Sequence, residues 1–229
     1  ISLQIFKNLF ISIAEEMGVT LGRTAYSPNI KERLDYSCAV FDKHGQMIAQ
    51  AAHIPVHLGS MSSSIEQAIK NQHCFDGDII ILNDPYLGGT HLPDITLVAP
   101  IYINNSLEGF IANRGHHADI GGMTPGSLPL STDVHQEGLI IPPIKLYSKG
   151  VLNEDVFQLI CRNSRTPGER RGDLSAQIAS IRTGEIRMKD VIAKYGIHEV
   201  VEHMDALMNY SEVLMKKTIS DIPNGKYSY

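Results

Sequence analysis

The stretch "ITLVAPIYINNSLEGFIANR", residues 95–114, decides the fold, because it holds two strand-like runs joined by a tight turn. Branched and aromatic residues dominate the first run, 95–103, and the second run occupies 106–114. Between them, Asn104 and Asn105 tolerate the left-handed backbone conformation that short hairpin turns need. We therefore predict a β-hairpin at this point of the chain.

Shorter segments on the N-terminal side predict further strands. The runs at 35–42 and 45–52 are alternating or apolar, and a turn around Gly45 joins them as a second hairpin. "GDIIIL", residues 77–82, is typical of a buried strand. These segments add at least three strands to the first hairpin.

Other segments predict helices. Apolar residues recur at helical spacing over 3–22 and again over 60–71, where Ser60 is available as the helix cap. "DVFQLICRN", residues 155–163, begins another helix. The predicted fold class is α+β, with a mixed or antiparallel β-sheet core and flanking helices.

The pattern changes at Gly168. Two long segments with helical periodicity follow, broken near Tyr195-Gly196, and we expect them to pack together as a C-terminal helical hairpin. The predicted domains are an α+β domain at 1–167 and this hairpin at 168–229. Because the chain starts with isoleucine and ends in the strand-like "NGKYSY", we expect a fragment of a longer protein that continues beyond the hairpin.

Composition excludes several kinds of partner. Lysine and arginine number 20 against 25 acidic residues, so the net charge is −5 and the chain lacks the basic stripe that nucleic-acid binding needs. The apolar runs are far shorter than a membrane span, which predicts no membrane insertion. Three cysteines, odd in number and far apart, fit reduced thiols in a cytoplasmic protein.

Histidines are concentrated in one part of the chain. Seven of the ten fall in the segment 53–135, and imidazole is both a metal ligand and a proton shuttle at neutral pH. For any one histidine alone, a hydrogen-bonded structural role is the alternative. His91 and Asp94 lie three residues apart on one loop, and Pro93 between them stiffens the backbone, so two ligands are assembled at low entropic cost.

A third ligand is available in "NRGHHADIGG", residues 113–122, which directly follows a predicted strand. It offers His116, His117 and Asp119. If the predicted strands at 77–82 and 106–114 are neighbours in one sheet, the loops that follow them can converge on one cation. A His/Asp/His set with open positions suits zinc, manganese or iron(II), whereas calcium and magnesium prefer oxygen ligands.

Three further polar signals are weaker. The pair Gly88-Gly89 could bring backbone N–H groups against an anion, or it could be only a turn. His135 and Glu137 could reach the cation or act as a base. Four arginines could clamp a carboxylate or phosphate, or form a solvated charged face: Arg162, Arg165, Arg170 and Arg171.

Five sequence blocks resemble one known family when they are taken together. In chain order they are "ERLDYSCAVFD", "HIPVHLGSM", "NDPYLGGTHLPDITL", "NRGHHADIGGMTPGS" and "EGLIIPPIKL". This set is similar to the hydantoinase B/oxoprolinase family, which includes the large subunits of N-methylhydantoinase and acetone carboxylase. The resemblance runs from near Ile1 to the end of the chain and covers the N-terminal half or less of a full family subunit.

The resemblance implies a subunit that works with a hydantoinase A-type ATPase partner in a hetero-oligomer. The partner uses ATP to phosphorylate an amide or carbonyl oxygen, and this subunit carries the activated intermediate onward. In the hydantoinase and oxoprolinase branches the outcome is hydrolytic ring opening of a small cyclic amide. In the carboxylase branch it is carbon–carbon bond formation with bicarbonate.

The resemblance also implies functional residues. A divalent metal, manganese in the best-known carboxylase, is held by positions that correspond to His91, Asp94 and His116, and it acts by Lewis-acid polarisation or through a metal-bound hydroxide. The expected catalytic residues are His57, His117, Asp119 and Glu137.

Two features of the sequence favour cyclic-amide hydrolysis over carboxylation. The block at residues 86–89 resembles the hydantoinase side, and the chain lacks the tryptophan that carboxylase-type sequences tend to have there. The alternatives are a carboxylase-like subunit and an assembly module whose histidines are structural and whose C-terminal helices dock the ATPase partner.

Overall fold

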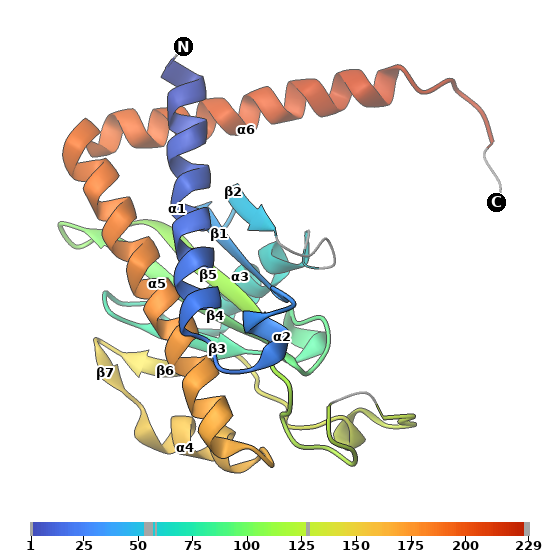
Figure 1. The fold of residues 1–229 in the computed structure, drawn as a ribbon. Helices are drawn as coiled ribbons and strands as arrows, with labels where there is room; N and C mark the ends of the chain where they lie inside the picture. Colours follow the sequence, from blue (N-terminus) through green and yellow to red (C-terminus); the bar gives the residue numbers. More distant parts are fainter. Residues whose placement is uncertain (1, 53–56, 58, 127–128, 227–229) are drawn as a thin grey trace.

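A seven-stranded sheet lies at the centre of the computed structural model, which describes residues 2–52, 57, 59–126 and 129–226 (Figure 1). Its strands are β1 (Tyr36–Asp42), β2 (Met47–Ala52), β3 (Ile79–Leu82), β4 (Asp94–Ile103), β5 (Ser106–His116), β6 (Ile144–Ser148) and β7 (Val151–Leu152). They lie in the order β2-β1-β5-β4-β3-β6-β7, and each of these pairings is antiparallel. The predicted α+β class is confirmed, and the sheet is antiparallel rather than mixed.

The predicted hairpin at residues 95–114 is confirmed as β4 and β5. Asn104 and Asn105 both adopt positive φ angles, 50° and 65°, which match the right-handed twist of the strands on either side. The pairing continues to the far end of the hairpin, where Asp94 lies opposite His116. The start of β4 and the end of β5 are therefore neighbours.

The second predicted hairpin and the buried strand are also confirmed. β1 pairs with β2 around Gly45, whose φ is 82°, and β1 pairs on its other side with β5. Every residue of β3 is buried. Three strands, β1, β5 and β4, thus lie side by side in the sheet.

The two faces of the sheet pack against different helices, because alternate residues of a strand point to opposite sides. On one face, Phe41 and its neighbours contact Met61 of α3 (Ser60–Asn71). The other face carries the larger hydrophobic cluster and is covered by α1 (Ser2–Thr24) and α5 (Pro167–Tyr195) (Figure 1).

The start of α3 differs from the prediction in its cap. Gly59, with φ 79°, is the N-cap residue, and no side chain caps the helix. Ser60 is already helical, so its Oγ points back and donates to the carbonyl of His57 at 3.1 Å. The same oxygen accepts a hydrogen bond from Arg114, so Ser60 serves a polar network rather than the helix end.

The other helices are short, apart from α6 (Ile197–Ser220). They are α2 (Pro28–Lys31), α4 (Glu154–Arg162) and the 3₁₀ turns η2 (Pro85–Leu87) and η3 (Val134–Gln136). The helix predicted to begin near residue 155 is confirmed as α4. In the described part of the chain, no helix combines the length and apolar character that crossing a bilayer requires.

The two C-terminal helices are present, but they turn a corner instead of lying side by side. Gly196 alone separates α5 from α6, and its φ of 84° and ψ of 149° redirect the chain without reversing it. α5 packs along α1 and the sheet (Figure 1). Beyond Leu207 the side chains of α6 are no longer buried.

Residues on both sides of Gly168 contribute to one hydrophobic cluster, as Leu97 of β4 and Leu174 of α5 show. The domain division at residue 168 stays a prediction, and residues 227–229 of the strand-like ending lie outside the described residues.

Candidate metal centre

Three of the predicted site residues meet at one end of the β4–β5 hairpin. Asp94 is the first residue of β4 and lies opposite His116, the last residue of β5. Residues opposite each other in an antiparallel pair point to the same face, so both side chains lie on the face that α3 covers. His91 lies three residues before Asp94, in the loop that enters β4. Antiparallel pairing of β4 and β5 therefore brings the candidate ligands together, whereas the prediction had two loops that each follow a strand.

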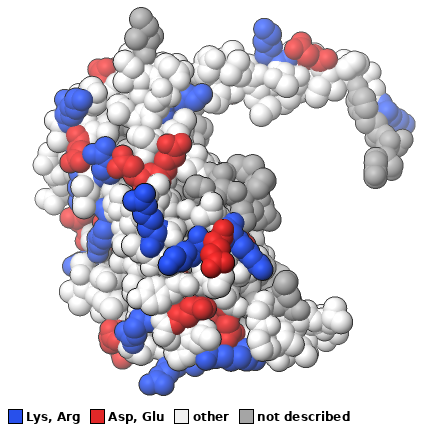
Figure 2. Space-filling model, in the orientation of Figure 1, with Lys and Arg blue, Asp and Glu red and all other residues white. Residues whose placement is uncertain are grey.

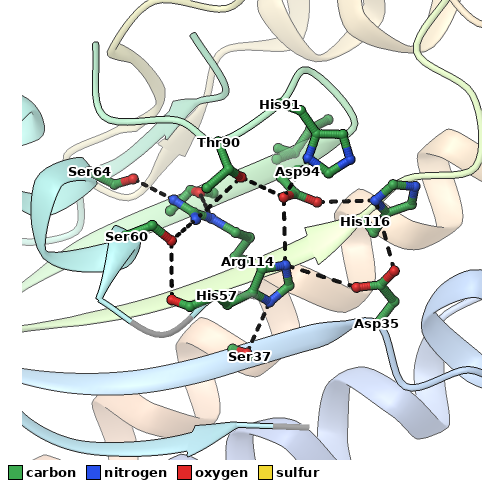
Figure 3. A network of polar contacts seen from close by, with 12 residues as sticks. Asp35, Ser37, His57, Ser60, Ser64, Thr90, His91, Asp94, Arg114 and His116 are labelled. Atoms are coloured by element: carbon green, nitrogen blue, oxygen red, sulfur yellow. Dashed lines mark hydrogen bonds and ion pairs between the residues drawn. The ribbon is translucent and has the colours of Figure 1, made fainter. Parts of the chain in front are cut away.

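The three side chains form a compact set of donors around Asp94 (Figure 3). Its Oδ2 lies 2.8 Å from His91 Nδ1, and its Oδ1 lies 3.1 Å from His116 Nδ1. One ligand atom from each of the three residues lies within 4.8 Å of the other two. The Asp94 side chain is fully buried, whereas 42% of the His91 side chain is exposed, so the set opens to solvent on one side.

The surroundings of Asp94 keep its carboxylate ionised. Burial opposes ionisation, but the imidazoles of His116, His57 and His91 outweigh it and hold the pKa of Asp94 well below its usual value. The hydrogen bond to Asp94 in turn raises the pKa of His91. Thr90 Oγ1 also donates to Asp94 Oδ2, at 2.5 Å. An ionised carboxylate between imidazoles is the form that binds a cation.

A buried arginine lies directly behind this set. Arg114 is fully buried on β5, two residues before His116, and therefore on the same face. Its guanidinium donates to Thr96 Oγ1 at 2.8 Å and to Ser64 Oγ at 2.7 Å, and it also reaches Ser60 and Thr90. Burial lowers the pKa of Arg114. Through these bonds one side chain connects β4, the start of α3 and the loop that carries His91 (Figure 3).

His57 is the one predicted catalytic residue that lies beside the ligand set. It is fully buried, and its Nδ1 lies 3.0 Å from Ser37 Oγ. Its Nε2 lies 3.6 Å from Asp94 Oδ2 and 3.9 Å from Asp35 Oδ1, and it makes no hydrogen bond within the described residues. A buried polar atom without a partner is uncommon and indicates a place where a ligand or water binds.

His117 points to the opposite face of the sheet. Its Nε2 lies 2.8 Å from Gln177 Oε1 on α5, and that oxygen can only accept, so His117 donates. Burial, reinforced by Arg170, lowers the pKa of His117 to about 3. The structure therefore places His117 in the core and separates it from His116 by the alternation of the strand.

The structure does not bring Asp119 or Glu137 to the ligand set either. Asp119 Oδ1 pairs with Arg165 at 3.1 Å and fastens the turn between α4 and α5. Glu137 accepts a hydrogen bond from Ser131 Oγ at 2.7 Å. His135 is exposed and pairs with Asp133, and His53 lies outside the described residues.

The glycine pair serves close packing of the loop onto α3. Gly88 has φ 90°, and a Cβ there would lie 2.6 Å from the carbonyl oxygen of Ser63. Its own carbonyl accepts a hydrogen bond from Ser64. Of the two roles predicted for Gly88-Gly89, these contacts fit the turn. Two of the four arginines that could clamp an anion, Arg165 and Arg170, instead form ion pairs with carboxylates of this chain.

Among the residues of this network that were not predicted from the sequence are Asp35, Thr90 and Arg114. The signal for Arg114 was its spacing of two from His116 in a predicted strand, which places both on one face. Thr90 adjoins His91. Asp35 could be found only from the pairing of β1 with β5, because that register places it next to His116.

Comparison with known proteins gives a consistent result. The chain matches the family described as Hydantoinase B/oxoprolinase over residues 1–229. It is 39% identical to 5-oxoprolinase 1 of Arabidopsis thaliana over 98% of the chain and 19% of that protein. It is 36% identical to the B-type subunit proposed for a D-/L-hydantoinase of Pseudomonas sp. strain NS671, over 100% of the chain and 40% of that protein.

Two solved structures share the fold. The ATP-dependent caprolactamase of Pseudomonas jessenii superposes with a TM-score of 0.91 and 31% identity, covering 97% of this chain and 39% of the other. An acetone carboxylase in nucleotide-free form gives a TM-score of 0.81 at 22% identity, over 88% and 28%, which shows the fold alone. The chain thus spans at most about two fifths of the length of these relatives.

Proposed function

Because the chain belongs to the hydantoinase B/oxoprolinase family, we propose that it is the metal-binding subunit of an ATP-dependent cyclic-amide hydrolase. In this proposal a hydantoinase A-type ATPase partner phosphorylates a small cyclic amide with ATP, and this subunit acts on the activated intermediate. The two subunits form a hetero-oligomer in the cytoplasm. The observation that carries the proposal is the convergence of His91, Asp94 and His116 at one end of the hairpin.

The residues present fit a divalent transition metal. Two imidazoles and one carboxylate are donors that zinc, manganese and iron(II) accept, and the set leaves coordination positions open. The unpartnered Nε2 of His57, buried and facing Asp94, supports a bound species at this place. When bound, such a metal supplies Lewis-acid polarisation of an oxygen atom of the activated intermediate.

The residues around the set hold it in shape and leave one side accessible. Thr90 and Arg114 fix the carboxylate of Asp94 and the loop before it, so the donors are positioned before any ion binds. Substrate reaches the site from the side on which His91 is exposed, since α3 and Arg114 close the other side. Among the four predicted catalytic residues we assign His57 to the reaction, because it alone lies beside the ligands.

Hydrolysis is favoured over carboxylation by the relatives. The 5-oxoprolinase and caprolactamase relatives are 39% and 31% identical, and their names denote action on cyclic amides. The carboxylase shares the fold at 22% identity. The caprolactamase is ATP-dependent, and the hydantoinase relative is named as one subunit of its enzyme, which supports a separate partner chain.

A second candidate function, docking of the ATPase partner, is supported by α6. The last turns of this helix expose large apolar side chains, including Val213 at 64% and Met215 at 61%. Apolar groups of this size on a projecting helix are typical of an interface. Removal of the residues after Leu207, where the side chains of α6 are no longer buried, tests the docking proposal in a pull-down, and the proposal fails if the truncated protein binds the partner unchanged.

Metal content tests the main proposal. Protein purified without chelator is expected to carry about one transition-metal ion per chain. Substitution of His91, Asp94 or His116 is expected to remove the ion. The exposed His73 and His198 are matched controls, since neither has a contact with the set among the described residues.

The same variants then test the reaction. With the partner and ATP, ring opening of a cyclic amide should be lost in Asp94→Asn and retained in the control variants. Equal metal content in the three site variants and the two control variants would contradict the assignment of the metal ligands. Retention of full ring-opening activity by Asp94→Asn would contradict the catalytic role.

A further inference from the structure

We propose that Gln177 of α5 is a positioning residue for the metal centre, and that it holds Asp94 and His116 in place from the opposite face of the sheet. This inference rests on the proposed function, since it concerns the ligands of the same ion. Gln177 acts through the backbone of the two strands that carry these ligands. No motif around Gln177 distinguished it in the sequence, because its role depends on where α5 lies on the sheet.

α5 packs on β4 and β5, on the face opposite to the candidate ligands (Figure 1). Alternate residues of a strand point to opposite faces, so Gly115 and His117 face α5, whereas the side chain of His116 faces away from it. The amide of Gln177 lies over Gly115, where a Cβ would be 3.5 Å from Gln177 Nε2. This amide therefore lies directly on the strand that carries His116.

The side-chain amide of Gln177 reaches a residue beside each of the two ligands. Its Nε2 donates to the carbonyl of Ile95, the residue after Asp94, at 2.9 Å. Its Oε1 accepts from Nε2 of His117, the residue after His116, at 2.8 Å. One side chain thus binds both arms of the hairpin next to the candidate ligands that they carry.

Asn113 fixes the orientation of this amide. Its Oδ1 accepts an N–H from Gln177 Nε2 at 3.0 Å, and its Nδ2 donates to the backbone carbonyl of Gln177 at 2.8 Å. The carbonyl of Ile95 can only accept, so the amide of Gln177 cannot flip without losing that hydrogen bond. The side chains of Asn113, His117 and Gln177 are fully buried, so water does not replace a lost partner.

The network continues into the loop that carries His91. The backbone N–H of His117 donates to the carbonyl of Pro93 at 2.8 Å, and Pro93 lies between His91 and Asp94. Metal–nitrogen and metal–oxygen bonds keep to about 2.0–2.2 Å, so small shifts of the backbone weaken the binding of an ion. Loss of the Gln177 amide leaves buried groups on both strands without partners, and the strands must shift to satisfy them.

Cobalt(II) binding tests the proposal, because the visible absorption of cobalt depends on the number and arrangement of its ligands. Gln177→Met keeps the approximate size of the side chain and removes its hydrogen bonds. Cobalt is titrated into the metal-free full chain. We expect this variant to bind cobalt at least ~10-fold more weakly than the unsubstituted protein, as loss of an outer support of a metal site does. We also expect its visible band to change.

Ile181→Ala is the matched control. Ile181 is fully buried one turn further along α5, and its side chain packs in the larger hydrophobic cluster. This substitution lowers stability through lost packing, but it should leave the cobalt affinity and the visible band of the folded protein unchanged. Equal changes in Ile181→Ala and Gln177→Met would show a general effect of a weakened core and would overturn the positioning role.

A milder variant, Asn113→Ala, keeps the proposal testable if Gln177→Met does not fold. It removes the side chain that orients the Gln177 amide, so the same changes are expected at a smaller size. If the folded Gln177 or Asn113 variant binds cobalt with unchanged affinity and an unchanged band, Gln177 does not position the ligands, and the proposed function still stands. If the unsubstituted protein binds no cobalt, or if Asp94→Asn binds it unchanged, both proposals fail.

Discussion

The pH dependence of stability is predicted to depend on His117, because this residue must stay neutral in the folded protein. Its imidazole is fully buried and its pKa falls to about 3, chiefly through burial. The unfolded chain takes up a proton near the ordinary histidine pKa of about 6.5. Because the pKa of His117 is lower in the folded protein, its contribution to the free energy of folding is complete above the unfolded-state pKa. This contribution is lost as the pH falls from that value toward 3.

The size of the loss in folding free energy follows from the difference between the pKa values of His117 in the unfolded and folded states. From about pH 7.5 to about pH 4.5, protonation of the unfolded chain at this one residue costs about 2.7 kcal/mol of folding free energy, at about 1.36 kcal/mol per pH unit below 6.5. His117→Gln removes the titrating ring and keeps an N–H that can donate to Gln177. This variant should therefore lose about 2.7 kcal/mol less than the unsubstituted protein over the same range.

Urea unfolding of chelator-treated protein at the two pH values measures the difference. His73→Gln is the control, because His73 is exposed and its substitution should leave the slope unchanged. Equal loss of stability in His117→Gln and in the unsubstituted protein would refute the conclusion that the core holds His117 neutral.

Three further substitutions follow from the geometry. Arg114→Met removes a charged hydrogen-bond donor from Ser64 and its neighbours, and it should lower the free energy of unfolding by about 2 kcal/mol in a urea titration. The control Arg162→Met, at an exposed position, should change that free energy by less than about 0.5 kcal/mol. Asn105→Val forces a β-branched residue to a φ of 65° and should cost about 1–2 kcal/mol in thermal unfolding. Gly88→Ala brings a Cβ within 2.6 Å of a carbonyl oxygen at φ 90°, and it should weaken metal binding measured by calorimetry, since the His91 loop must shift.

Local signals in the sequence were sufficient for β1 to β5 and for the longer helices, whereas β6, β7 and α2 were not predicted. The hairpin was predictable because Asn104 and Asn105 are among the few residues that adopt a left-handed turn, and the strands beside them are strongly β-prone. The corner at Gly196 was not predictable in the same way. A glycine allows a positive φ, but its ψ of 149° depends on α5 packing along α1, which is a contact between distant parts of the chain.

The same distinction holds at the site. His91 and Asp94 were found because they share one loop, and the structure brings them to His116 as expected. The position of Asp35 depends on the register between β1 and β5, and that register is set by packing across the whole sheet. His117 illustrates the opposite case. It follows the candidate ligand His116 directly in the sequence, but its side chain lies on the other face of the sheet.

The central claim is that His91, Asp94 and His116 bind one transition-metal ion. Crystals of protein purified without chelator, measured on both sides of the absorption edges of zinc, manganese and iron, test it most directly. We expect one anomalous peak within about 2.0–2.2 Å of one donor atom of each residue. No peak at these residues, or a peak held by other side chains, would contradict the claim.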